Sequence, residues 1–335
     1  MTSPTFDFEV QKLKKEIRTR KAKLVLIQLP EGLKPYGWQL AKAIEELGAI
    51  AIVSADHCYG GCDLPLAEAE SLGADLIVHY GHSQMVQQNA VPTIYIETKA
   101  KAHIKNVVWK AVPYLEQWRE IGLVTTIQHI EKLGEAEQVL LEAGKVVEIG
   151  DAGQMQYPGQ ITGCNYSNAR TVSDKVSAFL YVGGGKFHPI GVTLATRKPT
   201  IIADPFQKIA FKIQDEVTRI IKKRWANIQL FKQAKRIGII IGLKPGQKRY
   251  TQALELRDLL SKAGRQTMLL ALREITPEVA MQFPGVEAFI NTACPRITLD
   301  DSERFLKPII TPSESLVAIG QLRWGELWTK GWFED

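Results

Sequence analysis

The chain has 335 residues, of which 45% are hydrophobic and 23% charged, and it carries a formal net charge of +6. This composition is typical of a globular protein built from two or three compact units and argues against a largely disordered chain. No apolar run reaches the roughly 18 residues of a membrane-spanning helix, and the first residues lack the apolar stretch of a secretion signal, so we expect a cytoplasmic protein.

The first predicted unit starts with an apolar strand over residues 23–29, followed by an amphipathic helix that ends at Gly48 in the left-handed conformation. The apolar face of this helix is formed by Leu40, Ala41, Ile44 and Leu47. Further predicted strands in this unit cover residues 49–56, 74–83 and 92–98.

The same order of elements returns twice. A strand, a helix ended by glycine and three more strands recur after residue 120 and again after residue 235, with Gly144 and Gly264 at the helix ends. The predicted strands of these two units cover residues 121–127, 145–151, 178–185 and 199–205, then 236–243, 265–272, 287–293 and 307–313. The helix faces are Leu133, Ala136, Leu140 and Ala143, then Ala253, Leu256, Leu260 and Ala263.

Short apolar strands that alternate with amphipathic helices are typical of parallel sheets covered on both faces. The sequence therefore predicts an α/β fold of three similar domains, each a small four-stranded parallel sheet flanked by helices. We place these domains at residues 1–110, 111–220 and 221–335. The alternative is one doubly wound sheet, but four elements that recur three times in one order favour triplication.

The densest basic stretch, residues 219–236, does not indicate a nucleic-acid site. Its apolar residues recur at helical spacing, which predicts a surface helix with a solvated basic face. No nucleic-acid-binding motif accompanies it, so we expect no direct contact with nucleic acid. The apolar residues of this helix are Ile220, Ile221, Trp225, Ile228 and Phe231.

Three of the four cysteines stand where strands of a parallel sheet would end. Cys62 and Cys164 follow the second strands of their units, and Cys294 follows the third strand of the last unit. Ligands bind beyond the carboxyl ends of such strands. Three thiolates would suit an iron–sulfur cluster with one open iron, whereas a structural zinc would need a fourth ligand. The alternative is that these cysteines are ordinary buried small residues.

Cys58 stands four residues before Cys62 in the glycine-rich loop "DHCYGGCDLP". The two thiols look like half of a local metal site, yet no second close cysteine pair follows in the chain. Whether Cys58 and Cys62 act together is left open by the spacing.

Several motifs carry a resemblance to a known family. The stretches "LPEGLKPYG", "CYGGCDLPLAEAESLGADLIVHYGHS", "PTIYIET", "YVGGGKFHPIG", "ADPF" and "NTACPRI" resemble the archaeal enzyme of the first step of diphthamide biosynthesis, the 2-(3-amino-3-carboxypropyl)histidine synthase family. The resemblance covers nearly the whole chain. It implies a homodimer in which Cys62, Cys164 and Cys294, one from each domain, hold a [4Fe–4S] cluster, whereas Cys58 matches no ligand position.

The resemblance also implies a reaction. The reduced cluster passes an electron to S-adenosylmethionine, and the 3-amino-3-carboxypropyl group is transferred to C2 of a histidine of translation elongation factor 2. Methylthioadenosine leaves, and an unidentified electron donor reduces the cluster. The radical chemistry that this implies is non-classical. In agreement with this, the chain lacks the C-x3-C-x2-C motif of classical radical S-adenosylmethionine enzymes.

Residues at strand ends are the candidates for binding the cosubstrate, since glycine amides and nearby cations suit its carboxylate. The side chains of Lys186, Lys248 and Arg249 offer positive charge for this carboxylate. His57 is a further candidate, as a neighbour of the cluster. The predicted cosubstrate residues are Gln28, Pro30, Glu31, Gly32, Gly81, His82, Gly183, Gly184, Gly185, His188 and Gln247.

Two other functions fit the same features. One is a quinolinate synthase-like enzyme, which uses a three-cysteine cluster as a Lewis acid. The other is a non-catalytic iron–sulfur partner subunit. The tryptophan-rich segment "LRWGELWTKGWFED" predicts core packing, with an interface as the alternative.

Overall fold

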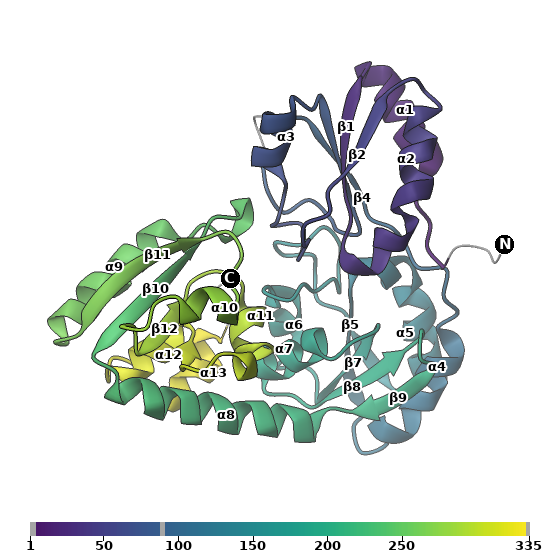
Figure 1. The fold of residues 1–335 in the computed structure, drawn as a ribbon. Coiled ribbons are helices and arrows are strands. Elements are labelled where there is room, and N and C mark those ends of the chain that lie inside the picture. Colours follow the sequence, from purple (N-terminus) through teal and green to yellow (C-terminus); the bar gives the residue numbers. More distant parts are fainter. Residues whose placement is uncertain (1–4, 88–90, 333–335) are drawn as a thin grey trace. The chain divides into compact units, whose positions relative to one another are not determined.

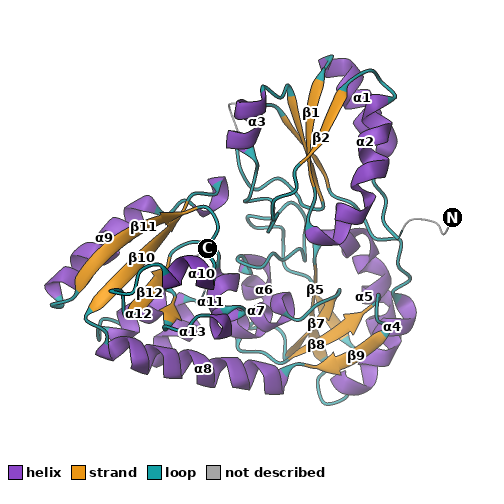
Figure 2. Cartoon of the chain, viewed as in Figure 1, coloured by secondary structure: helices purple, strands orange, loops and turns teal. Residues whose placement is uncertain are grey.

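The computed structural model describes residues 5–87 and 91–332, and it contains the same sheet three times (Figures 1 and 2). The orders are β2-β1-β3-β4, β6-β5-β7-β8-β9 and β11-β10-β12-β13, and every pair is parallel except that of β8 and β9. The predicted α/β fold of three parallel sheets is confirmed. The second sheet has a fifth strand, the antiparallel β9 (Ile209–Lys212), where four strands were predicted. This strand has only four residues, and its first and last residues are exposed.

Each predicted strand is present, with bounds close to those expected. In the first sheet they are β1 (Leu24–Gln28), β2 (Ile50–Val53), β3 (Leu76–Tyr80) and β4 (Thr93–Ile96). In the second they are β5 (Glu120–Thr125), β6 (Val146–Glu148), β7 (Ala178–Val182) and β8 (Thr200–Asp204). In the third they are β10 (Arg236–Gly242), β11 (Gln266–Leu272), β12 (Ala288–Asn291) and β13 (Ile309–Ile310).

The chain divides into two compact units. The first comprises Met1–Ala102, Ile127–Glu131 and Lys244–Gly246, and the second comprises His103–Thr126, Lys132–Leu243 and Gln247–Asp335. The first unit thus holds the first sheet, and the second unit holds the other two sheets. The bounds of three separate domains remain a prediction.

In the first unit, successive side chains of the central strand β1 point to opposite faces of the sheet. The hydrophobic core therefore has two parts, one on each face. Val25 and Ile27 face α1 (Val10–Arg20) and α2 (Gly37–Glu45), which contribute buried Leu13 and Leu40. Leu26 faces the opposite side, where α3 (Leu66–Leu72) packs through its own apolar residues. Helices therefore cover both faces of this sheet, as a parallel sheet requires.

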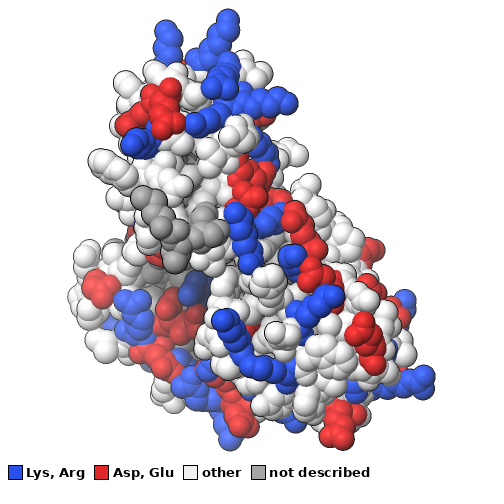
Figure 3. Space-filling view, turned by 90° about the vertical axis from the view of Figure 1, so that its right-hand side faces the viewer, with Lys and Arg blue, Asp and Glu red and all other residues white. Residues whose placement is uncertain are grey.

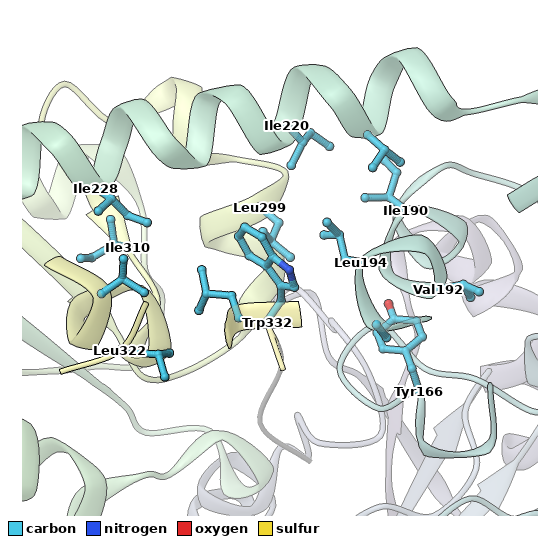
Figure 4. Packing of buried hydrophobic residues seen from close by; sticks show 14 of the residues in the cluster. Tyr166, Ile190, Val192, Leu194, Ile220, Ile228, Leu299, Ile310, Leu322 and Trp332 are labelled. Atoms are coloured by element: carbon cyan, nitrogen blue, oxygen red, sulfur yellow. The ribbon is translucent and has the colours of Figure 1, made fainter. Parts of the chain in front are cut away.

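In the second unit one hydrophobic cluster joins the second and third sheets. The long helix α8 (Gln214–Gln233) supplies Ile220 and Ile228 to it, and Figure 4 shows them beside Leu299, Ile310 and Trp332. This confirms an amphipathic helix in the basic stretch. The other helices of this unit are α4 (Lys105–Ala111), α5 (Leu133–Glu142), α6 (Ser167–Val172), α7 (Phe187–Thr196), α9 (Tyr250–Lys262), α10 (Pro277–Met281), α11 (Pro295–Leu299), α12 (Pro312–Ala318) and α13 (Leu327–Lys330).

The tryptophan-rich segment packs as predicted. Trp332 is 2% exposed, and its ring makes edge contacts with Trp324 and Trp328, with centroids 5.3 and 5.4 Å away. Such edge-to-face pairs add to the stabilisation that burial of large apolar rings provides.

The helices that follow β1, β5 and β10 end alike. Gly48, Gly144 and Gly264 all have left-handed φ angles, of 80°, 74° and 75°. The predicted glycine caps are thereby confirmed, and their recurrence marks equivalent points of the three repeats.

A carboxylate marks another equivalent point in the first and third repeats. Asp75, just before β3, accepts hydrogen bonds from the amides at the start of β1 at 2.8 and 2.9 Å. Glu287, just before β12, does the same for the start of β10 at 2.6 and 3.1 Å. Each carboxylate therefore sets the register of the central strand beside its neighbour.

The surface charge is mixed. On the face drawn in Figure 3, acidic and basic side chains are interspersed and form no continuous basic field. Within the described part of the chain, no helix is both long and apolar enough to cross a bilayer.

Candidate metal centre

The carboxyl ends of β1 and β3 form the edge of the first sheet at which its strand order reverses. The chain runs from β1 outward to β2 and then crosses to β3 on the other side. Crevices at such a point are the usual ligand sites of open α/β sheets. Gln28 ends β1, His79 lies near the end of β3, and Cys58 and Cys62 lie in the loop after β2.

The loop that carries Cys62 is held by a buried ion pair. Lys244 donates to Asp63 at 2.7 Å, with both side chains less than 5% exposed, and its ammonium lies 4.0 Å from the centre of the Tyr59 ring. The amide of Gly246 donates to the Cys62 carbonyl at 2.7 Å. A Cβ atom at Gly246 would lie 2.5 Å from the Cys62 Cβ, so only glycine fits there.

A buried hydrogen-bonded chain extends from the same loop into the sheet. The Gln28 amide donates to the Asp63 carbonyl at 2.6 Å, and its oxygen lies 2.6 Å from Nδ1 of His79. Nε2 of His79 lies 3.0 Å from Nδ1 of His82. Burial holds the pKa of His79 well below its usual range and lowers the pKa of His82 to about 4, so both rings are neutral at physiological pH.

Cys58 completes this group. Each of Cys58, His79 and His82 offers one atom that could bind a metal ion, and these three atoms lie within 4.8 Å of one another. Cys58 is 2% exposed, and its amide donates to Glu31 at 3.3 Å. Burial, with the nearby charges of Asp63 and Glu31, raises the pKa of the Cys58 thiol. His79 was missed by sequence reasoning, although two histidines three residues apart at the end of a buried strand were a usable signal.

In the second unit, Cys164 and Cys294 share a neighbour. Burial raises the pKa of the Tyr166 hydroxyl well above its usual range, and charges on Cys164, Tyr181 and Cys294 act in the same direction. Tyr166 packs against Gly191 of α7, where any Cβ atom would clash with its hydroxyl. The Cys164 thiol lies 3.7 Å from the Thr162 hydroxyl.

Cys294 stands at the start of α11 and is positioned by Asn291, the last residue of β12. The Asn291 amide donates to the Cys294 carbonyl at 2.8 Å and to the Thr298 hydroxyl at 2.9 Å. Its oxygen accepts from the Ala293 amide at 3.0 Å. The turn between β12 and α11 is therefore held by one buried side chain.

The glycine-rich turn after β7 was predicted to bind the cosubstrate. Gly183 and Gly185 have positive φ angles of 154° and 77°, which are open to glycine and strained for other residues. Lys186 is paired with Glu216 at 2.7 Å, and the His188 ring stacks beside Tyr181 with centroids 6.2 Å apart. The turn leads directly into α7.

The predicted site residues divide between the two units. Gln28, Pro30, Glu31, Gly32, Cys62, Gly81 and His82 lie in the first unit, and Cys164, Gly183, Gly184, Gly185, His188, Gln247 and Cys294 lie in the second. The structure links Gln28 to His82 through His79. The meeting of all three predicted ligand cysteines stays a prediction.

The three cysteines fit an iron–sulfur cluster by their chemistry. Each is a partly exposed cysteine that forms no disulfide and follows the carboxyl end of a strand, and thiolates are the ligands such clusters take. Gly60 leaves the space beside the Cys62 sulfur without a side chain, since a Cβ atom there would lie 3.5 Å from it. Cys58, by contrast, is fully buried among histidines.

Comparison with known proteins agrees with this reading. Residues 29–329 match the family model described as "Putative diphthamide synthesis protein". The chain is 37% identical over 308 residues to the 2-(3-amino-3-carboxypropyl)histidine synthase of Pyrococcus horikoshii, covering 91% of this chain and 88% of that protein. It is 32% identical to subunit 1 of the Gallus gallus synthase, covering 95% of this chain and 78% of the relative.

A solved structure is similar over nearly the whole chain. The crystal structure of Dph2 from Pyrococcus horikoshii with a 4Fe-4S cluster superposes with a TM-score of 0.87 at 35% identity, covering 95% of this chain and 92% of that one. Because the family model, the relatives and the structure all span most of its length, the chain belongs to the diphthamide synthesis protein family.

Proposed function

We propose that the chain is a 2-(3-amino-3-carboxypropyl)histidine synthase, which transfers the 3-amino-3-carboxypropyl group of S-adenosylmethionine to C2 of a histidine on elongation factor 2. The observation that carries this proposal is the 37% identity to the Pyrococcus horikoshii synthase over 91% of the chain. The solved relative with its 4Fe-4S cluster supports an iron–sulfur cofactor.

Cys62, Cys164 and Cys294 are the residues we assign to hold the cluster. When bound, a [4Fe–4S] cluster supplies the electron that cleaves the bond between the sulfonium and the methionine γ-carbon. Three protein thiolates would leave one iron of a bound cluster open to the cosubstrate. The protein holds the thiols in place through Gly246, which binds the Cys62 carbonyl, and through Asn291, which binds the Cys294 carbonyl.

The cosubstrate's carboxylate is assigned to the glycine turn 183–185. Backbone amides that precede a helix attract anions, and α7 starts two residues beyond this turn. His188 and Gln247 are further proposed contacts in the second unit. In the first unit the proposed contacts are Gln28, Gly81 and His82, together with residues 30–32.

We also propose that the enzyme works as a homodimer in the cytoplasm with elongation factor 2 as its protein substrate and a separate electron donor. Relatives named subunit 1 raise a second possibility, that this chain needs a different partner subunit. All three ligand cysteines are present in one chain, which favours self-sufficiency.

The test is turnover by the purified chain alone. Anaerobically reconstituted protein, dithionite, S-adenosylmethionine and elongation factor 2 are mixed, and methylthioadenosine and the mass of the elongation factor are measured. We expect both product formation and a mass gain of one 3-amino-3-carboxypropyl group. An elongation factor in which the target histidine is replaced by alanine serves as the control and gains no mass.

Other outcomes separate the rival functions. Quinolinate formed from iminoaspartate and dihydroxyacetone phosphate would favour the quinolinate synthase-like function. Activity that appears only when a second, different subunit is added would assign the chain as a partner subunit. Protein that holds zinc and no iron after anaerobic reconstitution would refute the proposed cofactor.

A further inference from the structure

We propose that Cys58, His79 and His82 form a second metal site, which binds one zinc ion within the first compact unit. Their ligand atoms all lie within 4.8 Å of one another. Cys58 comes from the loop after β2, His79 from the end of β3 and His82 from the turn that follows β3. Among the residues that the structure describes, no other trio of cysteine, histidine or acidic side chains gathers so closely. The inference does not depend on the proposed transferase activity.

The hydrogen bonds around His79 determine which of its nitrogens is available. The Gln28 amide must direct its NH₂ group at the Asp63 carbonyl, 2.6 Å away, because a carbonyl can only accept. Its oxygen then accepts from Nδ1–H of His79. This tautomer leaves the lone pair on Nε2, the atom that faces His82. Metal-bound histidines show this arrangement, with the second nitrogen donating to a fixed acceptor.

The spacing of the three groups suits a tetrahedral ion after a small adjustment. Zinc binds sulfur at about 2.3 Å and imidazole nitrogen at about 2.0–2.1 Å, so its ligand atoms lie roughly 3.3–3.6 Å apart. His79 and His82 are slightly closer than this, at 3.0 Å, and Cys58 is within 4.8 Å of both. No fourth cysteine, histidine or acidic ligand joins the trio in the described chain, so a water molecule would fill the remaining position.

The surroundings of Cys58 favour the thiolate form of its side chain only when a cation is bound beside it. Cys58 is 2% exposed and lies near the charges of Asp63 and Glu31, which disfavour a second negative charge. Zinc binding would release the thiol proton to solvent and replace this repulsion by attraction. Thiolate and imidazole together select zinc over magnesium or calcium, which take oxygen ligands.

The repeat itself places a ligand residue here. Asp75 and Glu287 have the same role before β3 and β12, and His82 and Cys294 are each the seventh residue after that carboxylate. The first repeat therefore has a histidine at the position where the third has a proposed cluster cysteine. The same strand end carries a metal-binding side chain in both repeats.

Zinc would join the loop after β2 to the end of β3. Cys62 lies four residues beyond Cys58 in that loop, so the ion would hold the backbone that presents a cluster ligand. Zinc in this position would hold the loop of Cys62 in place before the cluster assembles.

Metal analysis of the anaerobically purified chain tests this inference. We expect about one zinc per chain in addition to the cluster iron, with one sulfur and two nitrogens around zinc by X-ray absorption. Cobalt substitution should produce a thiolate-to-cobalt charge-transfer band. A wild-type chain that binds neither zinc nor cobalt in this way overturns the proposal, whatever the variants do.

Paired variants separate this site from the cluster. Cys58→Ser should lose zinc and keep iron, whereas Cys62→Ser should lose iron and keep zinc. Gln28→Leu removes the acceptor of His79 and should weaken zinc binding by about 10–100-fold. His57→Asn is the matched control, since this exposed neighbour of Cys58 stands outside the trio and should leave zinc unchanged.

The two proposals fail in different ways. If the wild-type chain binds zinc but no iron, the transferase proposal falls and the zinc site stands. If it binds iron and turns over while zinc is absent, the trio is a buried hydrogen-bonded group and the zinc site is refuted. Zinc that is lost in Cys62→Ser and kept in Cys58→Ser would also refute the assignment.

Discussion

In the first repeat the central strands end in the paired residues Gln28 and His79, whereas the corresponding pair of the third repeat is Ile240 and Asn291. In each sheet, this pair is the last one in the parallel pairing of the central strand with its neighbour. Gln28 and His79 are linked to the loop of Cys62, while Asn291 alone organises the turn of Cys294.

The second repeat adds a third variant, with Thr125 and Val182 as the last pair. The same arrangement of strands thus carries a different set of polar groups at the carboxyl end of each sheet. Strand order and register are therefore repeated, whereas the polar groups at the strand ends differ from one repeat to the next.

The largest effect is expected at Cys294, the cluster ligand proposed in the third repeat. Cys294→Ser should reduce bound iron strongly and bring methylthioadenosine formation to background, because serine is a poor cluster ligand. Iron analysis and turnover measure this, with circular dichroism showing that the fold is kept. Full activity of this variant would contradict the assigned ligand set.

The buried ion pair of the second unit comes next. Arg224 of α8 binds Glu314 at 2.8 and 2.6 Å with both side chains fully buried, and it also donates to the Thr298 and Ile309 carbonyls. Glu314→Ala leaves a buried guanidinium without its carboxylate, which typically costs about 3–5 kcal/mol. Denaturant unfolding should show the loss.

An exposed pair serves as the control for this prediction. Arg236 and Glu287 lie at the surface, and the side-chain pair itself contributes little there. Arg236→Ala should therefore change the unfolding free energy by less than about 1 kcal/mol. Equal losses in the two variants would show that burial does not decide the effect.

A smaller effect is expected from Gly246, which lies against Cys62. Gly246→Ala inserts a methyl group against the Cys62 backbone and should destabilise that loop by about 1–3 kcal/mol, with faster hydrogen exchange over residues 56–65. Gly285→Ala is the matched control, because no atom lies within 4 Å of a Cβ atom there. If both variants exchange alike, the close approach is unimportant.

The smallest effect concerns Asp75 and Glu287, the carboxylates that stand just before β3 and β12 in the first and third repeats. Backbone amide donors hold the pKa values of Asp75 and Glu287 below their usual values of 3.8 and 4.5. The unfolded chain therefore binds more protons, and the stability these groups contribute is lost as the pH falls below those values.

Removing both carboxylates should reduce this acid sensitivity. Asp75→Asn with Glu287→Gln should be less stable at neutral pH and should have a flatter dependence of melting temperature on pH in the acid range. Ser177 stands at the equivalent place in the second repeat, where its hydroxyl donates to Glu120. Ser177→Ala is the control and should leave the acid slope unchanged.

Much of the fold could be predicted because its signals are local. Apolar runs, helical periodicity and the glycines at 48, 144 and 264 depend only on neighbouring residues, and all are confirmed. Strand β9 was missed because its exposure pattern comes from its place at a sheet edge. The basic stretch was predicted as a solvated face, yet Arg224 within it is fully buried against Glu314.

The sequence by itself determined the three-fold recurrence of strands and helices, the positions of the four cysteines and, by resemblance, the family. Only the tertiary structure decided which polar side chains contact one another. Gln28 and His79 are 51 residues apart, Arg224 and Glu314 are 90 apart, and Asp63 and Lys244 are 181 apart. Their meeting depends on sheet order and loop path, because a buried charge or amide is stable only where a distant partner satisfies it.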